Sequence, residues 1–274
     1  MRRLLIAAVT LVTALSGLAS PALAVDTIPF TDANGLIQVQ GSVDGAPAVP
    51  MLVNLGAGID VLSNDLGRRY VVVKGKYVSL RLSGERADLP IGTVNSFTIG
   101  GVRIDTPHVG IWKGLDGSAV DGLIAATAFR NIVTTFDFRN HQIVIEDAQT
   151  APERERAGLR VPLLLQDDLG LALAVFARFD FGGGKTGLCE IDTGAQGITL
   201  DKTFAEANGL QAGGATSGRV AQVALSGLPQ TAIMGAPVRF ADLIYDCDVG
   251  NSFWAGRTFT IDLPNRFIYI NTSG

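Results

Sequence analysis

The chain has 274 residues and a formal net charge of −4 at neutral pH, from 22 basic and 26 acidic side chains. This acidic balance argues against nucleic acid and anionic lipid as partners. Glycine is abundant and aromatic residues make up only 7% of the chain, and the short Val/Ile/Leu runs are separated by Gly, Asn and Asp. This pattern favours a β-rich chain over a helical one.

Residues 1–24 have the layout of a secretory signal peptide. Arg2 and Arg3 precede an uncharged apolar run over residues 4–18, and Ala22-Leu23-Ala24 supplies the small residues of a cleavage site. The apolar run is short and wrongly flanked for a membrane span, and no later stretch is long enough, so an uncleaved anchor is the less favoured alternative. We therefore expect an exported protein, periplasmic or secreted, with no membrane association once the leader is cleaved near Val25. The remaining chain of about 250 residues is enough for one large domain or two smaller ones.

The first half of the mature chain begins with a predicted β-hairpin. Strands are expected at 37–43 and 49–53, joined by an Asp-Gly turn at 44–45. The loop Asn54-Leu55-Gly56-Ala57 comes next, and an apolar strand then ends near Ser63 in a short capped turn over 63–67.

Two later segments of the first half matter for the repeat described below, one apolar and one with the pattern of a hairpin. Residues 121–126 include the apolar pair Leu123-Ile124 followed by Ala125, and residues 134–145 form a predicted hairpin. The stretch 148–160 is rich in Ala, Glu and Arg and contains one Pro, which is typical of an exposed linker.

The second half repeats these features at long period. Asp192-Thr193-Gly194-Ala195 aligns with Asn54-Leu55-Gly56-Ala57 at a spacing of 138 residues, and a short helix is expected after it, capped by Asp201 and stopped by Gly209. Further on, Val249-Gly250 aligns with Ile124-Ala125 at a spacing of 125, which also relates the hairpin 134–145 to the hairpin 259–270. The mature chain is therefore interpreted as a tandem duplication.

The Asp192-Thr193-Gly194-Ala195 loop between apolar strands resembles the catalytic loop of aspartic proteases, of the retropepsin-like and pepsin-like kind. Val249-Gly250 resembles the hydrophobic-hydrophobic-Gly segment that packs beside that loop. The resemblance covers nearly the whole mature chain. It implies an all-β protein with two pseudo-symmetric acid-protease-like lobes facing a central cleft: a first lobe over 25–147, the linker over 148–160 and a second lobe over 161–274.

In the family, each lobe contributes one Asp to a pair that shares a proton and activates water. Here the resemblance assigns a catalytic role to Asp192, and Asn54 takes the place of the second Asp. Leu55 lacks the hydroxyl that Thr193 offers across the lobes, and Ala125 places a methyl group where the family leaves bare backbone. Residues of the supporting loops are otherwise those expected by resemblance: Gly56, Ala57, Thr193, Gly194, Ala195, Ile124, Val249 and Gly250.

Two classes of function follow from these departures. The protein is either a non-catalytic peptide-binding protein that reuses the cleft, with proteolysis weakened or lost, or an active aspartic endopeptidase. An active enzyme would use Asp192 with a water positioned by Asn54, or two Asp192 carboxylates brought together by dimerisation. Asp60 is not expected to replace the missing carboxyl, because a strand carries it away from Asn54.

Cys189 and Cys247 each precede a landmark of their half by three residues. If the two strands lie side by side, as the resemblance implies, the sulfurs face each other, and export permits a disulfide. Two separately buried thiols are the alternative. His108 and His141 are the only histidines and neither has a second ligand at suitable spacing, so we expect neither a metal nor a cofactor.

Overall fold

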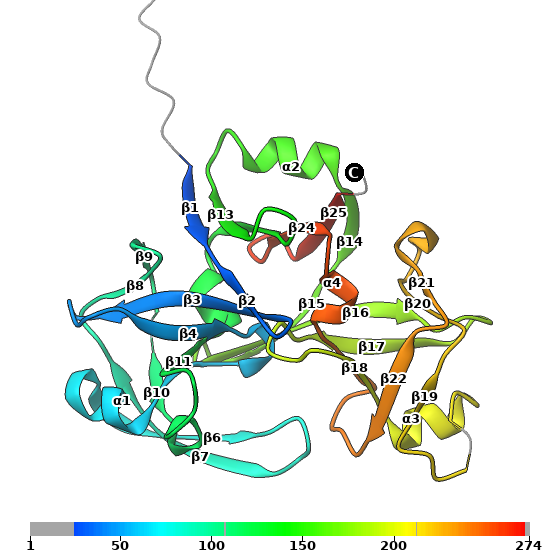
Figure 1. Cartoon of the computed structure of the whole chain (residues 1–274), viewed down its shortest axis with the longest axis horizontal. Coiled ribbons are helices and arrows are strands. Elements are labelled where there is room, and N and C mark those ends of the chain that lie inside the picture. Colours follow the sequence, from blue (N-terminus) through cyan, green and yellow to red (C-terminus); the bar gives the residue numbers. More distant parts are fainter. Residues whose placement is uncertain (1–24, 107, 212, 272–274) are drawn as a thin grey trace, which may run out of the picture.

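The computed structural model describes residues 25–106, 108–211 and 213–271, so the expected signal peptide lies outside the described residues. The described chain forms one sheet from each half and a third sheet to which both halves contribute (Figure 1). The all-β, two-lobed architecture expected from the sequence is therefore confirmed.

The first-lobe sheet has ten strands. In spatial order it contains β6 (Val72–Leu80), β7 (Arg86–Thr93), β10 (Val109–Ile111), β5 (Asp60–Leu62), β11 (Gly122–Ile124), β4 (Val49–Val53), β3 (Leu36–Val43), β8 (Phe97–Ile99) and β9 (Val102–Ile104), with β2 (Thr31–Ala33) paired to β3. The hairpin predicted from residues 37–53 is present as β3 and β4.

The second-lobe sheet has nine strands. In spatial order it contains β19 (Ser217–Arg219), β22 (Pro237–Ala241), β18 (Ile198–Asp201), β23 (Cys247–Val249), β17 (Thr186–Ile191), β16 (Ala172–Asp180), β20 (Gln222–Leu225) and β21 (Ile233–Met234), with β15 (Leu164–Asp168) paired to β16.

The third sheet joins the lobes. Its six strands are β1 (Asp26–Pro29), β13 (Gln142–Glu146), β12 (Val133–Asp137), β24 (Thr258–Asp262), β25 (Phe267–Asn271) and β14 (Leu159–Pro162). In Figure 1 it stands above the two lobes, with the green helix α2 (Ala151–Ala157) beyond it. The segment 148–160 predicted as a linker thus carries α2 and the first residues of β14.

Helices are short and lie at strand ends. Besides α2 they are α1 (Asn64–Tyr70), α3 (Lys202–Ala207) and α4 (Asn251–Trp254), with single 3₁₀ turns η1 (Leu55–Ala57), η2 (Lys113–Leu115), η3 (Ala126–Phe129) and η4 (Pro229–Thr231). The predicted cap of α3 is confirmed, because the Asp201 side chain accepts a hydrogen bond from the N–H of Phe204. The predicted turn at 63–67 is longer than expected: the Ser63 side chain caps α1, which runs on to Tyr70. No helix in the described ranges combines the length and apolar character needed to cross a membrane.

The predicted repeat is visible in strand register. In the first lobe, β11 pairs parallel with β4 and antiparallel with β5, and in the second lobe β23 pairs parallel with β17 and antiparallel with β18. The two hairpin turns also match. Asp137 accepts hydrogen bonds from the backbone and side chain of Asn140, and Asp262 does the same for Asn265.

The pseudo-twofold relation passes between β12 and β24. Thr135 and Thr260, equivalent residues of the two halves, are paired across these strands, and their hydroxyl oxygens lie 2.7 Å apart. Next to them the rings of Phe136 and Phe259 stack with centroids 5.1 Å apart. Equivalent residues meet here because the two strands are related by the same local axis.

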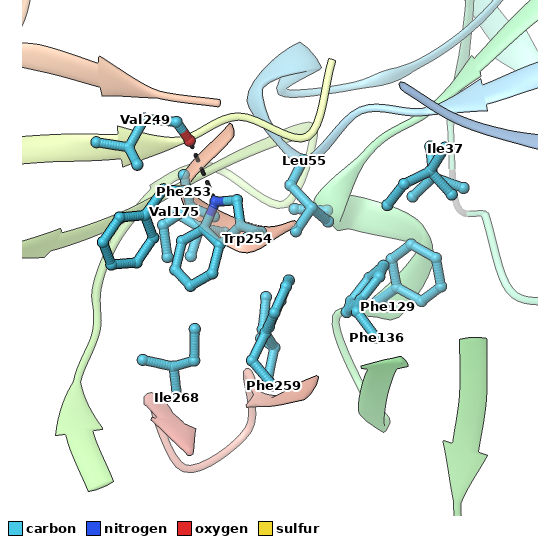
Figure 2. Close-up of a cluster of buried hydrophobic side chains, with 14 of the residues drawn as sticks. Ile37, Leu55, Phe129, Phe136, Val175, Val249, Phe253, Trp254, Phe259 and Ile268 are labelled. Atoms are coloured by element: carbon cyan, nitrogen blue, oxygen red, sulfur yellow. Dashed lines mark hydrogen bonds between the residues drawn. The ribbon is translucent and has the colours of Figure 1, made fainter. Parts of the chain in front are cut away.

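A continuous apolar core connects this sheet to the lobes (Figure 2). Trp254 is fully buried, its ring centroid lies 4.5 Å from that of Phe259, and its Nε1 donates to the carbonyl of Val249 at 3.3 Å. Leu55 reaches into the same region from the first lobe. The core therefore fixes the positions of both predicted catalytic loops relative to one another.

Candidate functional site

The loops that carry Asp192 and Asn54 meet at the junction of the lobes. Asp192 directly follows β17 and Asn54 directly follows β4, and both residues are half-buried. A Cβ atom placed on Gly56 would lie 2.6 Å from Cγ of Asp192, and one placed on Gly194 would lie 2.1 Å from Nδ2 of Asn54. Each side chain thus packs against the glycine of the opposite loop, and only glycine leaves it room.

The backbone on either side of the pair is also matched. The N–H of Asp192 donates to the carbonyl of Val249 at 3.2 Å, and the N–H of Asn54 donates to the carbonyl of Ile124 at 2.8 Å. The structure therefore brings the two predicted loops together with the apolar segments that contain Ile124 and Val249.

Asp192 is held by backbone donors. The N–H of Gly194 donates to its Oδ1 at 2.7 Å. Burial raises the pKa of the Asp192 carboxyl above its ordinary value, and hydrogen bonds from the N–H groups of Gly194, Ala195 and Gly56 oppose this rise. The carboxyl consequently keeps its proton to a higher pH than a solvated aspartate.

Asn54 provides no second carboxyl. Its amide is neutral at all relevant pH values, and its Oδ1 is buried without a hydrogen-bond partner among the described residues. Facing Asp192, the amide can orient a water or a ligand group but cannot take up or release the proton that a carboxyl pair shares.

Only one half of the cross-lobe hydroxyl contact is present. The hydroxyl of Thr193 donates to the carbonyl of Val53 at 2.8 Å and accepts from the N–H of Leu55 at 3.0 Å. Leu55 cannot return this contact, and its buried side chain joins the apolar core instead.

Ala125 and Gly250 share one backbone conformation, with φ and ψ of −89° and 177° in the first and −85° and −173° in the second. A Cβ on Gly250 would lie 2.4 Å from the carbonyl oxygens of both Ala195 and Gly197, because the second-lobe loop closes tightly over it. The N–H of Gly250 donates to the carbonyl of Gly197 at 2.9 Å.

The first lobe uses a side chain in place of that loop carbonyl. The N–H of Ala125 donates to Oδ1 of buried Asp60 at 2.7 Å, and the Thr127 hydroxyl donates to Oδ2 at 2.9 Å. Burial raises the pKa of Asp60 to about 7 despite these hydrogen bonds. Both oxygens of Asp60 are engaged in these hydrogen bonds. Asp60 therefore does not replace the missing partner of Asp192, in agreement with the expectation from the sequence.

Asn251 supports the loops of the candidate site, and the sequence analysis missed it. Its Nδ2 donates to the carbonyl of Thr193 at 2.8 Å and to that of Gly35 at 2.7 Å, which ties the Asp192 loop to the turn before β3. Its first-lobe equivalent is Ala126. A comparison of the two repeats could therefore have identified Asn251, because a polar residue of the second lobe aligns there with an apolar one of the first.

Glu190 and Asp248 were also missed. They are paired across β17 and β23, are 5% and 4% exposed, and lie on the strands that lead to Asp192 and Gly250. Burial, and secondly the charge of Asp192, raise the pKa of Glu190 to about 9 and that of Asp248 to about 8. The equivalent pair in the first lobe is Leu52 and Leu123, so again the repeat comparison would have revealed them.

Cys189 and Cys247 form a disulfide, with α-carbons 4.5 Å apart. They are partners in the parallel pairing of β17 with β23, one residue before Glu190 and Asp248. The side-by-side arrangement that the resemblance implied is thereby confirmed, and the bond ties the two strands of the second-lobe site together.

The hairpin β6–β7 bridges the two lobes over the loops. At its tip the carbonyl of Leu82 accepts a hydrogen bond from the N–H of Ile244 at 3.0 Å. The hydroxyl of Tyr77 donates to Oδ2 of Asp168 at 2.8 Å. The cleft between the lobes is therefore roofed on one side by this hairpin.

Two cavities lie under the hairpin. One, of about 350 Å³, is lined by Glu190, Asp168, Gln166, Tyr77 and Tyr245, and we term it the acidic chamber. The other, of about 190 Å³, is lined mainly by Ile59, Val61, Leu89, Trp112 and Leu123 beside Asn54, with Arg81, paired to Glu85, at its wall, and we term it the apolar chamber. Both chambers have Gly56, Ala57 and Ser79 in their walls, so they adjoin at the Asn54 loop. The described residues contain no group of three or more His, Cys, Asp or Glu side chains arranged to hold a metal ion.

The fold and the paired loops define a protein with the two-lobed, pepsin-like architecture of the aspartic proteases. No family model and no curated protein sequence matches the chain. Solved structures do match. Basic 7S globulin from soybean has a TM-score of 0.57 and 11% identity over 91% of this chain and 95% of that chain.

Two further structures give the same result. Conglutin gamma, a basic 7S globulin from lupine seeds, has a TM-score of 0.56 and 9% identity over 91% of this chain and 95% of that chain. An aspartic proteinase from Irpex lacteus has a TM-score of 0.54 and 13% identity over 92% of this chain and 98% of that chain. At such identities these likenesses concern the fold alone, and the closer likeness to retropepsins stays a prediction.

Proposed function

We propose that the protein is an exported, aspartic-protease-like protein whose cleft binds polypeptide and whose proteolytic activity is weakened or lost. The observation that carries this proposal is the position of Asn54, which faces Asp192 from the opposite loop where the chemistry needs a second carboxyl. The degenerate half is the first lobe, since Asn54, Leu55 and Ala125 all belong to it.

The chemical reason lies in the proton that a carboxyl pair shares. Peptide hydrolysis by this route needs one ionised carboxyl to activate water and one protonated carboxyl to donate to the carbonyl oxygen. Asp192 alone cannot hold both states at once, and the Asn54 amide cannot supply the other. Loss of a general acid or base lowers the rate by about a hundredfold to ten-thousandfold.

Peptide binding is supported by the roofed cleft. The β6–β7 hairpin offers backbone and side-chain groups over two adjoining chambers, and the exposed side chains of Val78 and Leu80 project from it. Extended polypeptide is suited to such a space because it presents alternate side chains to opposite walls.

An active endopeptidase is the second candidate. The unpaired Oδ1 of Asn54 favours it, since an amide acceptor opposite Asp192 can position a water for the carboxylate that forms once the pH exceeds the raised pKa of Asp192. Pairing of two Asp192 carboxylates between chains would give another active form.

Cleavage of a mixed peptide library between pH 3 and pH 8 separates these candidates. The experiment compares the mature protein with its Asp192→Asn variant. We expect no cleavage above background by either protein and binding of peptides by both. Robust cleavage by the wild-type protein that disappears in Asp192→Asn would contradict the proposal and favour the active endopeptidase. A cleavage rate that rises with the square of protein concentration would identify the dimeric form.

Export is tested separately by mass spectrometry of the protein recovered outside the cytoplasm. A mature N-terminus near Val25 is expected. An intact Met1 on membrane-bound protein would remove the signal-peptide hypothesis.

A further inference from the structure

The two lobes differ in chemistry at equivalent positions of their central strands. Leu52 and Leu123 are paired across β4 and β11, where they belong to the apolar wall of the first lobe. The equivalent pair in the second lobe is Glu190 and Asp248. One side of the Asn54–Asp192 junction is therefore apolar and the other carries carboxyls.

Glu190 lacks a protein partner. Its side chain is 5% exposed, lines the acidic chamber and makes no hydrogen bond or ion pair with any described residue. Oδ1 of Asp248 beside it is buried and equally unpartnered. The Glu190 carboxyl opens into the chamber, whereas burying the Asp248 oxygen without a partner costs free energy, and such an atom is uncommon where no ligand or function requires it.

The acidic chamber contains no cation of its own. Its described lining includes Asp167 and Asp168 together with Glu190, and no Lys, Arg or His side chain. Asp167 is neutralised from outside by Arg130, and Asp168 accepts the Tyr77 hydroxyl. The Tyr77 hydroxyl leaves the charge of Asp168 in place, so Glu190 is the acidic side chain of this chamber without any protein hydrogen bond, and Asp168 adds to the negative charge around it.

We propose that the acidic chamber receives a cationic side chain, lysine or arginine, of a polypeptide bound in the cleft, and that Glu190, backed by Asp248, is its counter-ion. This inference rests on the proposed peptide binding and adds the class of ligand. Because both chambers adjoin at Gly56 and Ala57, the same ligand places an apolar residue next to the basic one.

Titration of these groups gives the proposal a second readout. Glu190 faces Asp192 and Asp248 on its own sheet and Tyr245 across the chamber, with Tyr77 and Asp168 on the chamber's other walls. Its pKa of about 9, raised by burial and then by Asp192 and Asp248, means that it holds a proton at neutral pH while the chamber is empty. A bound cation favours the ionised carboxylate, so binding should release about one proton.

The test uses two peptide pools with random flanks around a central Phe. One pool has Lys on either side of the Phe, and the other has norleucine, which matches the lysine stem without its amine. Calorimetry at pH 7 in phosphate and in Tris gives both the affinity and the number of protons exchanged. The proteins compared are the mature wild type, Glu190→Gln, Asp248→Asn and, as a matched control on exposed helix α3, Glu206→Gln, each checked for native circular dichroism.

We expect wild type and Glu206→Gln to bind the lysine pool about 10- to 100-fold more tightly than the norleucine pool, with release of about one proton. In Glu190→Gln the affinities for the two pools should differ by no more than about threefold, and the affinity for the norleucine pool should not fall. Equal affinity of wild type for the two pools, or a preference that survives both Glu190→Gln and Asp248→Asn, would overturn this inference and leave peptide binding intact. If the wild-type protein binds neither pool, the proposed function is refuted, and the inference with it.

Discussion

The hydroxyl of Thr193 in the second lobe is hydrogen-bonded to the backbone N–H of Leu55 in the first lobe, at 3.0 Å. The same hydroxyl donates to the carbonyl of Val53 at 2.8 Å, so one side chain connects both loops of the candidate site. Both contacts are buried, and no second hydroxyl supports them from the Leu55 side.

Replacing Thr193 with valine should therefore destabilise the protein by about 2 to 4 kcal/mol, because two buried backbone groups lose their partner while the side-chain volume is kept. Urea unfolding measures the change. Thr193→Ser should recover most of the loss, and Thr186→Val, at the exposed start of strand β17, should have little effect. A Thr193→Val variant as stable as the wild type would show that the cross-lobe contact adds nothing to folding.

The second-lobe loop should reject a methyl group that the first lobe accommodates. Gly250→Ala places a Cβ against two backbone oxygens and should cost more than about 2 kcal/mol. Ala125→Gly, at the equivalent position, should cost only about 1 kcal/mol, mainly through backbone entropy. Gly75→Ala in strand β6 is the control, since a Cβ there meets nothing within 4 Å. Thermal unfolding of the three variants checks the order, and equal losses at positions 125 and 250 would contradict the asymmetry of the two loops.

Stability should fall as the pH rises from about 5 to about 8. The pKa of Glu190 is raised from 4.5 to about 9, that of Asp248 from 3.8 to about 8 and that of Asp60 from 3.8 to about 7. A carboxyl whose pKa is higher in the folded state stabilises that state fully below its unfolded pKa, and this contribution is lost as the pH rises through the folded pKa.

For Glu190 the contribution to stability is lost over the pH range from about 4.5 to about 9. We expect the unfolding free energy of the wild type to fall by roughly 2 to 5 kcal/mol between pH 5 and pH 8, and Glu190→Gln to flatten the curve. Denaturant unfolding at several pH values provides the measurement, with Glu206→Gln as the control. A wild-type curve that rises over this range would mean that these buried carboxyls are ionised and stabilised in the folded protein.

Restoring a carboxyl opposite Asp192 should not by itself restore full proteolysis. Asn54→Asp supplies the missing group, but Leu55 gives no hydroxyl to hold the new pair coplanar, so the carboxyls should sit too loosely by roughly an ångström. Adding Leu55→Thr and Ala125→Gly should raise the activity beyond that of the single variant. Because Leu55 is buried in the core, its replacement should also lower stability, by about 1 to 3 kcal/mol.

Initial rates on a mixed peptide library, from pH 3 to pH 8, compare the wild type with the single and triple variants. Each variant carrying Asn54→Asp is paired with one that also has Asp192→Asn, which should abolish any activity gained. Full activity of Asn54→Asp alone would show that the Thr193 contact is sufficient to align the pair.

Local sequence patterns were sufficient for much of the fold and for part of the site. Alternation and the Asp-Gly turn predicted β3 and β4, the Asp201 cap predicted α3, and the repeat spacings of 138 and 125 aligned Asn54 with Asp192 and Ala125 with Gly250. These features are readable because turns, caps and repeats depend on neighbouring residues or on self-similarity. The helix α2 in the expected linker was not predicted, since its packing on β25 is a long-range contact.

Only the tertiary structure decided which side chains face the cleft. Strand β17 is buried on both faces over Cys189–Ile191, so alternation in the sequence does not tell which of these residues lines a chamber and which joins the core. The pairing of β17 with β23 joined Cys189 to Cys247 and set Glu190 beside Asp248, residues that are 58 positions apart in the chain. The sequence by itself thus determined that one carboxyl of the expected pair is missing. Strand pairing, which depends on distant parts of the chain, decided that two other carboxyls are buried next to the one that remains.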